Sequence, residues 1–507
     1  MELLYKLEFN TTNSYYITII KDTIKDFKIN AHCEQYLGYI LIRFEEEQTK
    51  VDDFFAFVKE KMQSSLFARE WIKIDFHDDK SEALNNFDVK LNLSLFTDEE
   101  IVSLEKNNNI DFSNDLNKIK QGGISRFETR NGLKNIFLPS IKHKRDFEVR
   151  GHEVRLLITN IYKVSEILEL QPKETALLCT IERPLVKVRL RSEANAKELY
   201  SSTDFIYAKI ADDKESILFS NALKKEGIDY LMCVSDDIHQ YSLRVMPFKD
   251  QTLIIHGDKG LFPKIDYFTK EKYYSAKNYF DENKGVFNAI LQKHEEKGKN
   301  FLGVYFSMES KESAFKIKDQ NNILDVIKIP NIKNNFLHYL DKVAQTSLES
   351  KELIERYKNE HVSYFEHLEF DNTSNSFTTL LNHIALILGL RNHRDVNDLS
   401  LTCKSEKLEY FNIKTLKVNN KVYLDFREVL LDIIKLKILS YNNSDISYIF
   451  FKSLAYFINT SIREQKNITS IILCGNLFAN KVLLKYTYLY LENDYEIVMP
   501  KAYPLDY

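Results

Sequence analysis

The chain has 507 residues, which is too long for one hydrophobic core, because single cores stop growing at roughly 250–300 residues, so two to four domains are expected. Its hydrophobic content of 44% and charged content of 28% are typical of a soluble globular protein. The formal net charge of -4 gives no general attraction to phosphate backbones or anionic membranes, so nucleic acid is not expected as a partner.

The five cysteines contain no CxxC pair, so neither a zinc site nor a disulfide framework is expected, and a reducing cytoplasm fits best. The first residues lack the pattern of a signal peptide, and the longest apolar runs are shorter than the ~18 residues of a membrane span. We therefore expect a cytoplasmic protein without a transmembrane segment. Such a protein can still bind a partner protein that is itself membrane-bound. Only 13 glycines occur, which leaves few glycine-rich phosphate loops.

The first predicted domain, 1–77, is a small α+β unit. Its β-branched and aromatic runs predict strands, and amphipathic periodicity predicts helices. In chain order these are the strand Leu3–Phe9, the helix Ser14–Phe27, the strand Tyr39–Phe44, the helix Val51–Ser64 and the strand Trp71–Phe76.

The second predicted domain, 78–238, begins with a polar, Asn-rich connection over Asp78–Leu116. Mixed α/β structure is expected after it. The predicted elements are the strand Val154–Thr159, the helices Lys163–Leu170 and Lys173–Leu178, and the strand Leu185–Arg189.

The third predicted domain, 239–507, opens with a hairpin, continues with a strand at Phe301–Phe306 and has mostly helical periodicity from Asn335 to Lys466. It then returns to α/β structure. The last predicted elements are the strand Ser470–Leu473, the helix Asn480–Leu491 and the strand Glu496–Met499.

Three segments carry a family resemblance. The last, SIILCGNLFANKVLL over Ser470–Leu484, is similar to the L-S-G-G-V-F-Q-N-R-L-L of the HypF-type carbamoyltransferases of nickel–iron hydrogenase maturation. In that family a strand runs into a helix through a Gly-Gly turn that lets backbone approach a nucleotide. Gly475 and Asn480 match the motif, whereas Asn476 stands at its second glycine.

The other two segments occur in the family's order. SNSFTTLLNHIALILGL, over Ser374–Leu390, resembles T-S-x-G-R-L-F-D-A-V-A-A-L-L-G-L, with Thr378 for the family's glycine and Asn382 for its aspartate. ETALLCTIERPLVKVRL, over Glu174–Leu190, resembles E-x-x-L-L-x-S-x-x-R-P-I-V-L-L, and Lys120–Gly123 resembles K-G-I-G-G.

The resemblance implies an α+β and α/β multidomain fold, with an acylphosphatase-like unit, a YrdC-like domain and a C-terminal domain of the actin-like ATPase (ASKHA) type. HypF-type enzymes use these domains to hydrolyse carbamoyl phosphate, form carbamoyl-adenylate and transfer the carbamoyl group to the C-terminal cysteine of HypE.

Most residues that this chemistry needs are missing. An acylphosphatase-like site cradles phosphate with backbone amides and an arginine. The matching segment Asn10–Tyr16 has neither arginine nor glycine, and the family's paired CxxC zinc modules are absent. No Lys-Pro step occurs near Val154. The basic run Lys142–Arg155 could hold an anion, but a solvated face is the more common role of such a run.

The C-terminal domain departs from the family in the same way. Glu282–Val286 stands where the family has its H-H-H-A-H metal motif, and Ser307–Ser310 replaces Asp-Gly-Thr-Gly. Only Asp506 matches the closing N-D-G-G. Two further residues have structural interpretations that we favour: His383 as a hydrogen-bonded structural histidine rather than a ligand, and Cys474 as a small buried residue rather than a thiol activated by a helix N-terminus.

We therefore predict a catalytically degenerate accessory protein of hydrogenase maturation or assembly that acts by binding. It is similar to the shortened HypF relatives called HydE in operons of quinone-reactive nickel–iron hydrogenases. By resemblance, a weak residual site for ATP or AMP is expected, with no catalytic residue, metal ligand or zinc. Its residues are Gly475, Asn476, Asn480, Thr378 and Asn382.

The expected partners are hydrogenase subunits or other maturation proteins. The alternative is an active ATP-dependent carbamoyl- or threonylcarbamoyl-transferase with an altered site. In that case Asn382, Asn476, Asn480 and Asp506 would surround the nucleotide, although amide side chains cannot supply the charge of a metal-binding carboxylate.

Overall fold

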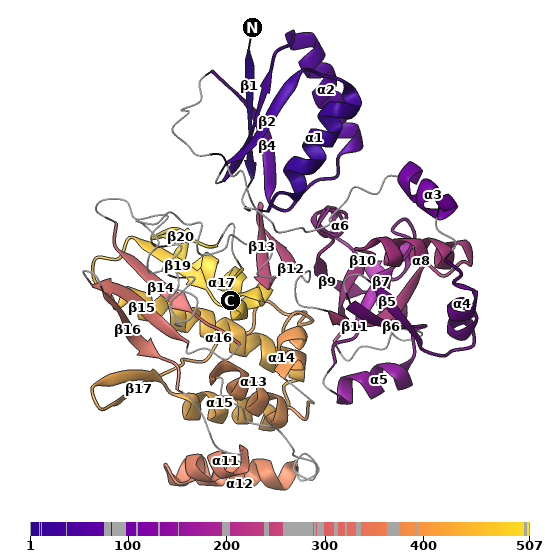
Figure 1. The fold of residues 1–507 in the computed structure, drawn as a ribbon. Coiled ribbons are helices and arrows are strands. Elements are labelled where there is room, and N and C mark those ends of the chain that lie inside the picture. Colours follow the sequence, from indigo (N-terminus) through magenta and orange to yellow (C-terminus); the bar gives the residue numbers. More distant parts are fainter. Residues whose placement is uncertain are drawn as a thin grey trace. The chain divides into compact units, whose positions relative to one another are not determined.

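The computed structural model divides the chain into two compact units, residues 1–274 with 501–503, and residues 275–500 with 504–507 (Figure 1). The residues that the structure describes are 2–9, 11, 13–36, 38–75, 83, 98–107, 110–129, 132–150, 152–194, 203–237, 243–256, 287, 291, 299–308, 313–319, 322–330, 336–361, 376–390, 393–500 and 504–505. Among these residues, no helix is long and apolar enough to cross a membrane.

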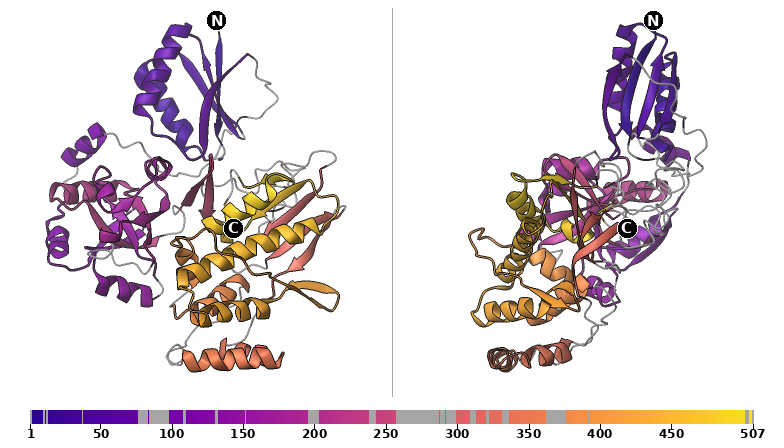
Figure 2. Two further views of the ribbon diagram at one scale, coloured as in Figure 1. Left: turned by 180° about the vertical axis from the view of Figure 1, so that it is seen from behind. Right: turned by 90° about the vertical axis from the view of Figure 1, so that its left-hand side faces the viewer.

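The first unit begins with an antiparallel four-stranded sheet of order β2-β3-β1-β4. Its strands are β1 (Leu3–Phe9), β2 (Ala31–Tyr36), β3 (Tyr39–Phe44) and β4 (Ala68–Ile74), and its helices are α1 (Tyr15–Phe27) and α2 (Gln48–Lys61). Both helices cover one face of the sheet (Figures 1 and 2). Alternate residues of β1 are buried, which is why its period-two pattern predicted the strand with its observed bounds.

A second sheet follows in the same unit, with the order β13-β12-β9-β10-β7-β11-β6-β5 and with β8 paired to β9. Its strands are β5 (Ser125–Thr129), β6 (Gly132–Phe137), β7 (Arg155–Ile158), β8 (Leu168–Glu169), β9 (Leu185–Leu190), β10 (Phe205–Ile210), β11 (Tyr230–Asp237), β12 (Arg244–Phe248) and β13 (Gln251–His256). The helical elements in this part of the chain are α3 (Asp98–Asn107), α4 (Ser113–Lys120), α5 (Ile141–Val149), η1 (Val164–Glu166), α6 (Pro172–Leu178), α7 (Ser192–Ala194) and α8 (Lys214–Lys225).

Two features of this sheet differ from the sequence-based expectation. The helix predicted over Lys163–Leu170 is only the short 3-10 turn η1, because Leu168 pairs with Leu190 of β9 and becomes part of a strand. The hairpin β12–β13 was expected to open the third domain, because it follows the predicted boundary at 238–239. Its first strand instead pairs in parallel with β9, so the hairpin extends the second sheet.

The second unit contains a seven-stranded sheet of order β17-β18-β16-β15-β14-β19-β20. Its strands are β14 (Phe301–Tyr305), β15 (Ala314–Asp319), β16 (Asn322–Lys328), β17 (Thr415–Val418), β18 (Lys421–Leu424), β19 (Ser470–Cys474) and β20 (Glu496–Val498). Its helical elements are α11 (Phe336–Ala344), α12 (Leu348–Glu360), α13 (Ser376–Ile387), α14 (His393–Leu399), α15 (Phe426–Ile438), α16 (Asn443–Arg463), η5 (Asn476–Ala479) and α17 (Lys481–Leu491). The helices α16 and α17 pack side by side (Figure 1).

The hairpin β17–β18 interrupts the region predicted as mostly helical. Asn419 and Asn420 form its turn with φ angles of 49° and 61°. Asparagine tolerates such positive φ angles, and two of them between short β-branched runs are typical of a hairpin turn. The Asn-Asn pair was therefore the signal for this hairpin.

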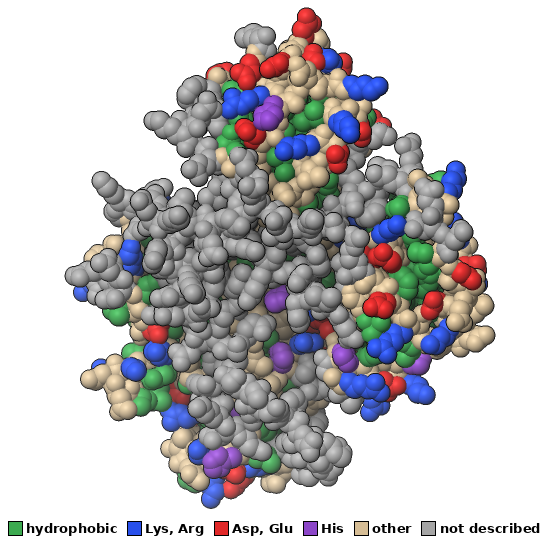
Figure 3. All heavy atoms as spheres, viewed as in Figure 1, with side chains coloured by type: hydrophobic (Ala, Val, Ile, Leu, Met, Phe, Trp, Pro, Cys, Tyr) green, Lys and Arg blue, Asp and Glu red, His purple; other side chains and the backbone are tan. Residues whose placement is uncertain are grey.

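Surface charge is mixed. On the face viewed in Figure 3, basic and acidic side chains are interspersed over the N-terminal sheet and its helices. This distribution agrees with the small net charge of the whole chain.

Candidate functional site

The strand β19 ends in a tight turn at Gly475. Gly475 has a φ of 98° and a ψ of 139°, a conformation that is essentially open only to glycine. A Cβ atom at this position would lie 2.0 Å from the carbonyl oxygen of Phe306. The Gly475 amide donates to the Leu505 carbonyl at 2.5 Å, and the Leu477 amide donates to the Phe306 carbonyl at 3.1 Å. The glycine is therefore required for the close approach of this turn to the end of β14.

Asn476 and Thr378 meet at Met308, just beyond β14. The Met308 amide donates to Asn476 Oδ1 at 2.6 Å, and Thr378 Oγ1 donates to the Met308 carbonyl at 2.6 Å. Met308 belongs to the segment that aligns with the family's Asp-Gly-Thr-Gly. Two of the predicted site residues thus come together, and both hold backbone of the protein itself.

Asn480 is 1% exposed and is held by several partners. Its Oδ1 accepts from the Leu483 amide at 2.9 Å and thereby caps α17. Its Nδ2 lies 2.7 Å from Asn397 Oδ1 and 2.9 Å from Ser400 Oγ. The matched asparagine of the motif is thus a helix cap that anchors the C-terminal end of α14.

Asn382 anchors the other end of the same helix. Its Oδ1 accepts from the His393 amide at 3.2 Å and lies 3.1 Å from His393 Nδ1. Burial, and secondarily the neighbouring Arg394, lowers the pKa of His393 to about 4, so this imidazole is neutral at pH 7. Asn382 and Asn480 therefore both contact α14, whereas Thr378 and Asn476 contact Met308.

His383 and Cys474 are both fully buried. Cys474 lies in an apolar cluster with Phe301 and Ile472, as expected for a small buried residue. His383 packs against the rings of Phe336 and Tyr339, at centroid distances of 5.2 and 5.6 Å, and burial lowers its pKa to about 4. Neither of its ring nitrogens has a hydrogen-bond partner, so the expected hydrogen-bonded histidine is buried and neutral but not satisfied.

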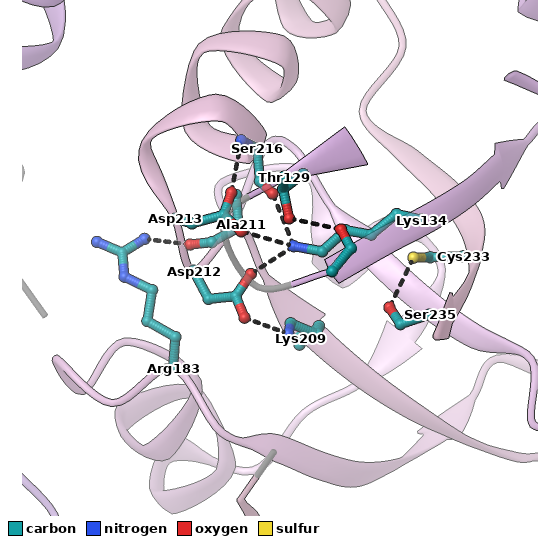
Figure 4. A network of polar contacts seen from close by, with 11 residues as sticks. Thr129, Lys134, Arg183, Lys209, Ala211, Asp212, Asp213, Ser216, Cys233 and Ser235 are labelled. Carbon is teal, nitrogen blue, oxygen red and sulfur yellow. Dashed lines mark hydrogen bonds and ion pairs between the residues drawn. The ribbon is translucent and has the colours of Figure 1, made fainter. Parts of the chain in front are cut away.

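A buried ionic network lies in the second sheet of the first unit and was not predicted (Figure 4). Lys134 on β6 donates to Asp212 at 2.8 Å, to Asp213 at 3.2 Å and to Ser216 at 2.7 Å. Lys209 on β10 donates to the second oxygen of Asp212 at 2.7 Å. Asp213 also caps α8, so the Asp-Asp pair before that helix was a visible capping signal.

The network is balanced in charge. Burial disfavours the ionised form of Asp212, but Lys134 and Lys209 outweigh it and hold the Asp212 pKa far below its usual range. Burial likewise disfavours charged Lys134, yet the two aspartates raise its pKa. Two lysines and two aspartates therefore neutralise one another within the protein.

Arg183, the matched arginine of the middle motif, lies beside this network with a φ of 46°. Its Nη1 donates to the Ala211 carbonyl at 2.9 Å (Figure 4), and burial lowers its pKa. In the basic run, Lys142, Arg145 and Arg150 are exposed, as on a solvated face, whereas Arg155 is buried and paired with Glu153.

The described residues offer no group of three His, Cys, Asp or Glu side chains that could hold a metal ion. A shallow cavity of about 440 Å³ is lined by residues between 161 and 175 together with Arg191. None of the predicted site residues lines it. Glu282–Val286, Glu309–Ser310 and Asp506 lie outside the described residues.

No protein-family model matches the chain, and no curated protein matches it. Solved structures do. Full-length HypF in its phosphate- and nucleotide-bound form superposes with a TM-score of 0.57 at 12% identity, covering 100% of this chain and 96% of that chain. HypF from T. kodakarensis gives a TM-score of 0.56 at 9% identity, with the same coverage. The chain therefore has a mixed α/β, multidomain, HypF-like fold along its full length.

Proposed function

We propose that this protein is an accessory factor of hydrogenase maturation that acts by binding, as a HypF relative in which carbamoyl transfer is lost. The full-length HypF-like fold supports the proposed role in hydrogenase maturation. The loss of chemistry rests on what the side chains of the predicted nucleotide site contact.

The observation that carries the proposal is that these side chains are hydrogen-bonded to the protein. Thr378 and Asn476 bind the backbone of Met308, while Asn382 and Asn480 hold α14. A nucleotide would have to replace these partly buried bonds, and a typical intramolecular hydrogen bond contributes about 1 kcal/mol. This arrangement favours a structural role over nucleotide chemistry.

The loop after β1 supports the same conclusion. Among the described residues of this loop, polar groups are used internally: the Asn13 amide donates to Thr11 Oγ1 at 3.2 Å, and the Tyr15 amide donates to Asn13 Oδ1 at 3.1 Å. The Gln35 side chain donates to the carbonyls of Thr11 and Asn13, at 3.0 and 3.2 Å. A phosphate cradle needs amides that point to a free centre and an arginine, and this loop supplies no arginine.

The resemblance to HydE-type accessory proteins suggests the partners, which we propose to be hydrogenase subunits or other maturation proteins in the cytoplasm. A nucleotide bound weakly at the turn after Gly475 would then serve as a regulatory ligand. A membrane-bound hydrogenase remains compatible as the client.

Two assays test the loss of chemistry. The purified full chain should neither hydrolyse carbamoyl phosphate nor exchange pyrophosphate into ATP in the presence of carbamoyl phosphate, while an active HypF run in parallel does both. Turnover above the protein-free blank would instead establish the alternative, an ATP-dependent carbamoyltransferase.

A genetic experiment tests the proposed role in hydrogenase maturation. Deletion of the gene should lower hydrogenase activity in cell extracts, and the wild-type gene supplied in trans should restore it. A tagged chain should co-purify with hydrogenase subunits or maturation proteins from the same strain. Unchanged hydrogenase activity after deletion would contradict the maturation role.

A further inference from the structure

The carboxylate of Glu182 is buried against the N-terminal sheet, although Glu182 itself belongs to the turn between α6 and β9. Glu182 is 3% exposed. Ser65 Oγ donates to it at 2.5 Å, the Leu66 amide donates to it at 3.0 Å, and the Tyr15 hydroxyl donates to the same oxygen as Ser65. Three donors, one from α1 and two from the loop before β4, therefore surround the carboxyl group of Glu182.

A backbone hydrogen bond lies directly beside this contact. The Ile181 amide donates to the Ser64 carbonyl at 2.9 Å. Ile181 and Phe67 are each 2% exposed, so the two polar contacts are shielded from water. Consecutive residues 181–182 thus contact consecutive residues 64–66, and water cannot easily replace the hydrogen bonds between them.

All the donors to Glu182 are neutral. Within the described part of the chain no lysine, arginine or histidine lies within ion-pair distance of it, and the neighbouring Arg183 donates instead to Ala211. The other titratable groups around it are Tyr15 and Tyr16 on α1 and Cys179 in its own turn, and burial raises the pKa of each of them. The pocket therefore accepts a carboxyl group but supplies no positive charge for a carboxylate.

We propose that Glu182 is a proton-sensitive latch that fastens the N-terminal four-stranded sheet to the second sheet and loosens when its carboxyl group ionises. Opening the latch would expose the Tyr15 and Ser65 hydroxyls and the Leu66 amide to water. This inference is independent of the proposed function, because it concerns only how the first unit holds together.

The direction of the effect follows from burial. Burial raises the pKa of Glu182, and the hydrogen bonds from Ser65, Tyr15 and Leu66 offset this only in part. A group whose pKa is raised in the closed state stabilises that state fully below its ordinary pKa, and this stabilisation is lost as pH rises through the raised value. The latch is therefore closed at acidic pH and opens as pH increases.

Hydrogen exchange on the full-length chain tests this inference. Protection factors, corrected for the intrinsic pH dependence of exchange, are measured for residues 13–24 and 62–75 between pH 5 and 8. In the wild type, protection should fall by up to roughly tenfold per pH unit between the ordinary and the raised pKa of Glu182, as expected for one linked proton, and should level off above the raised value. Residues 470–474 of β19 serve as the internal reference and should not change.

Two variants separate charge from shape. Glu182→Gln keeps an oxygen for the Leu66 amide, and the two hydroxyls can reverse their roles toward its amide nitrogen, so protection should persist and lose its pH dependence. Tyr15→Phe removes one donor while keeping the ring, so protection should fall only in residues 13–24 and 62–75. Glu166→Gln, an exposed site of the same unit, should behave as the wild type.

The proposal is overturned if wild-type protection of residues 13–24 and 62–75 is constant from pH 5 to 8. It is overturned equally if Glu182→Gln loses protection with pH as the wild type does. Equal loss of protection in residues 470–474 would identify global unfolding instead of a latch and would also contradict it.

Discussion

Asn476 on η5 and Thr378 on α13 both form hydrogen bonds with the backbone of Met308. Asn476 Oδ1 accepts a hydrogen bond from the Met308 amide, and Thr378 Oγ1 donates one to the Met308 carbonyl, each at 2.6 Å. The end of β14 is thereby joined to both elements. Because these three segments are separated in sequence, this contact is a tertiary crosslink of the second unit.

Removing either crosslinking side chain should destabilise the protein. We expect Asn476→Ala and Thr378→Ala each to lower the free energy of unfolding by about 1 kcal/mol, the usual contribution of one hydrogen bond. The double variant should depart from additivity, because both side chains act on Met308. Urea titration followed by tryptophan and tyrosine fluorescence measures these effects, with the exposed Asn493→Ala as the unaffected control.

Gly475 and Gly227 provide a matched pair of glycine tests. Both have positive φ, 98° and 74°, but only at Gly475 would a Cβ meet neighbouring atoms, whereas Gly227 has open space around it. Gly227→Ala should therefore cost only the backbone strain, about 1–2 kcal/mol. Gly475→Ala adds a steric clash with Phe306, so its free energy of unfolding should fall by about 3 kcal/mol or more, or the variant should fail to fold. Thermal unfolding measures both effects. If the two variants lose similar amounts of stability, the turn at Gly475 does not approach Phe306 as closely as the structure shows.

The network around Lys134 should respond strongly to loss of one partner. In Lys134→Met, Asp213 loses its buried cation, and breaking a buried ion pair in this way costs about 3–5 kcal/mol. The exposed pair of Lys120 and Glu226 is the comparison, since Lys120→Met should change stability by at most ~1 kcal/mol. Chemical denaturation of both variants at pH 7 measures the difference, and an equally small effect at Lys134 would mean that the network contributes little.

His383 should make stability depend on pH. Its pKa is lowered by burial to about 4, so the unfolded chain binds its proton first, and the stability contributed by the neutral imidazole is present above about pH 6.5 and lost as pH falls toward 4. His383→Phe removes this dependence along with an unsatisfied buried group. As the pH falls from 6.5 to 4, the free energy of unfolding of this variant should rise by roughly 3 kcal/mol relative to that of the wild type.

At pH 7 His383→Phe should match or slightly exceed the wild type in stability, because the buried nitrogens without partners are gone. A parallel pH profile for His383→Phe and the wild type would show that the imidazole is solvated or paired in solution.

The elements that were predicted most accurately are those with a strong local pattern. The strand at Leu3–Phe9 alternates buried and partly exposed residues, and β19 is an apolar run that ends at a glycine, so both could be placed from neighbouring residues alone. The hairpin β17–β18 was missed because its strands are only four residues long and β17 is exposed throughout. The helix predicted over Lys163–Leu170 was too long because local propensity does not include the pairing of β8 with β9.

The sequence by itself determined the order of apolar segments that produces a HypF-like fold, the match of Gly475 to the family's turn, and the absence of arginine and CxxC pairs from the family's positions. Only the tertiary structure decided what the polar residues contact. Asn480 binds Asn397, Lys134 binds Asp212, and Glu182 binds Ser65. The physical reason is that a hydrogen bond between distant segments depends on the packing that brings them within about 3 Å, and no local pattern of residue types encodes that distance.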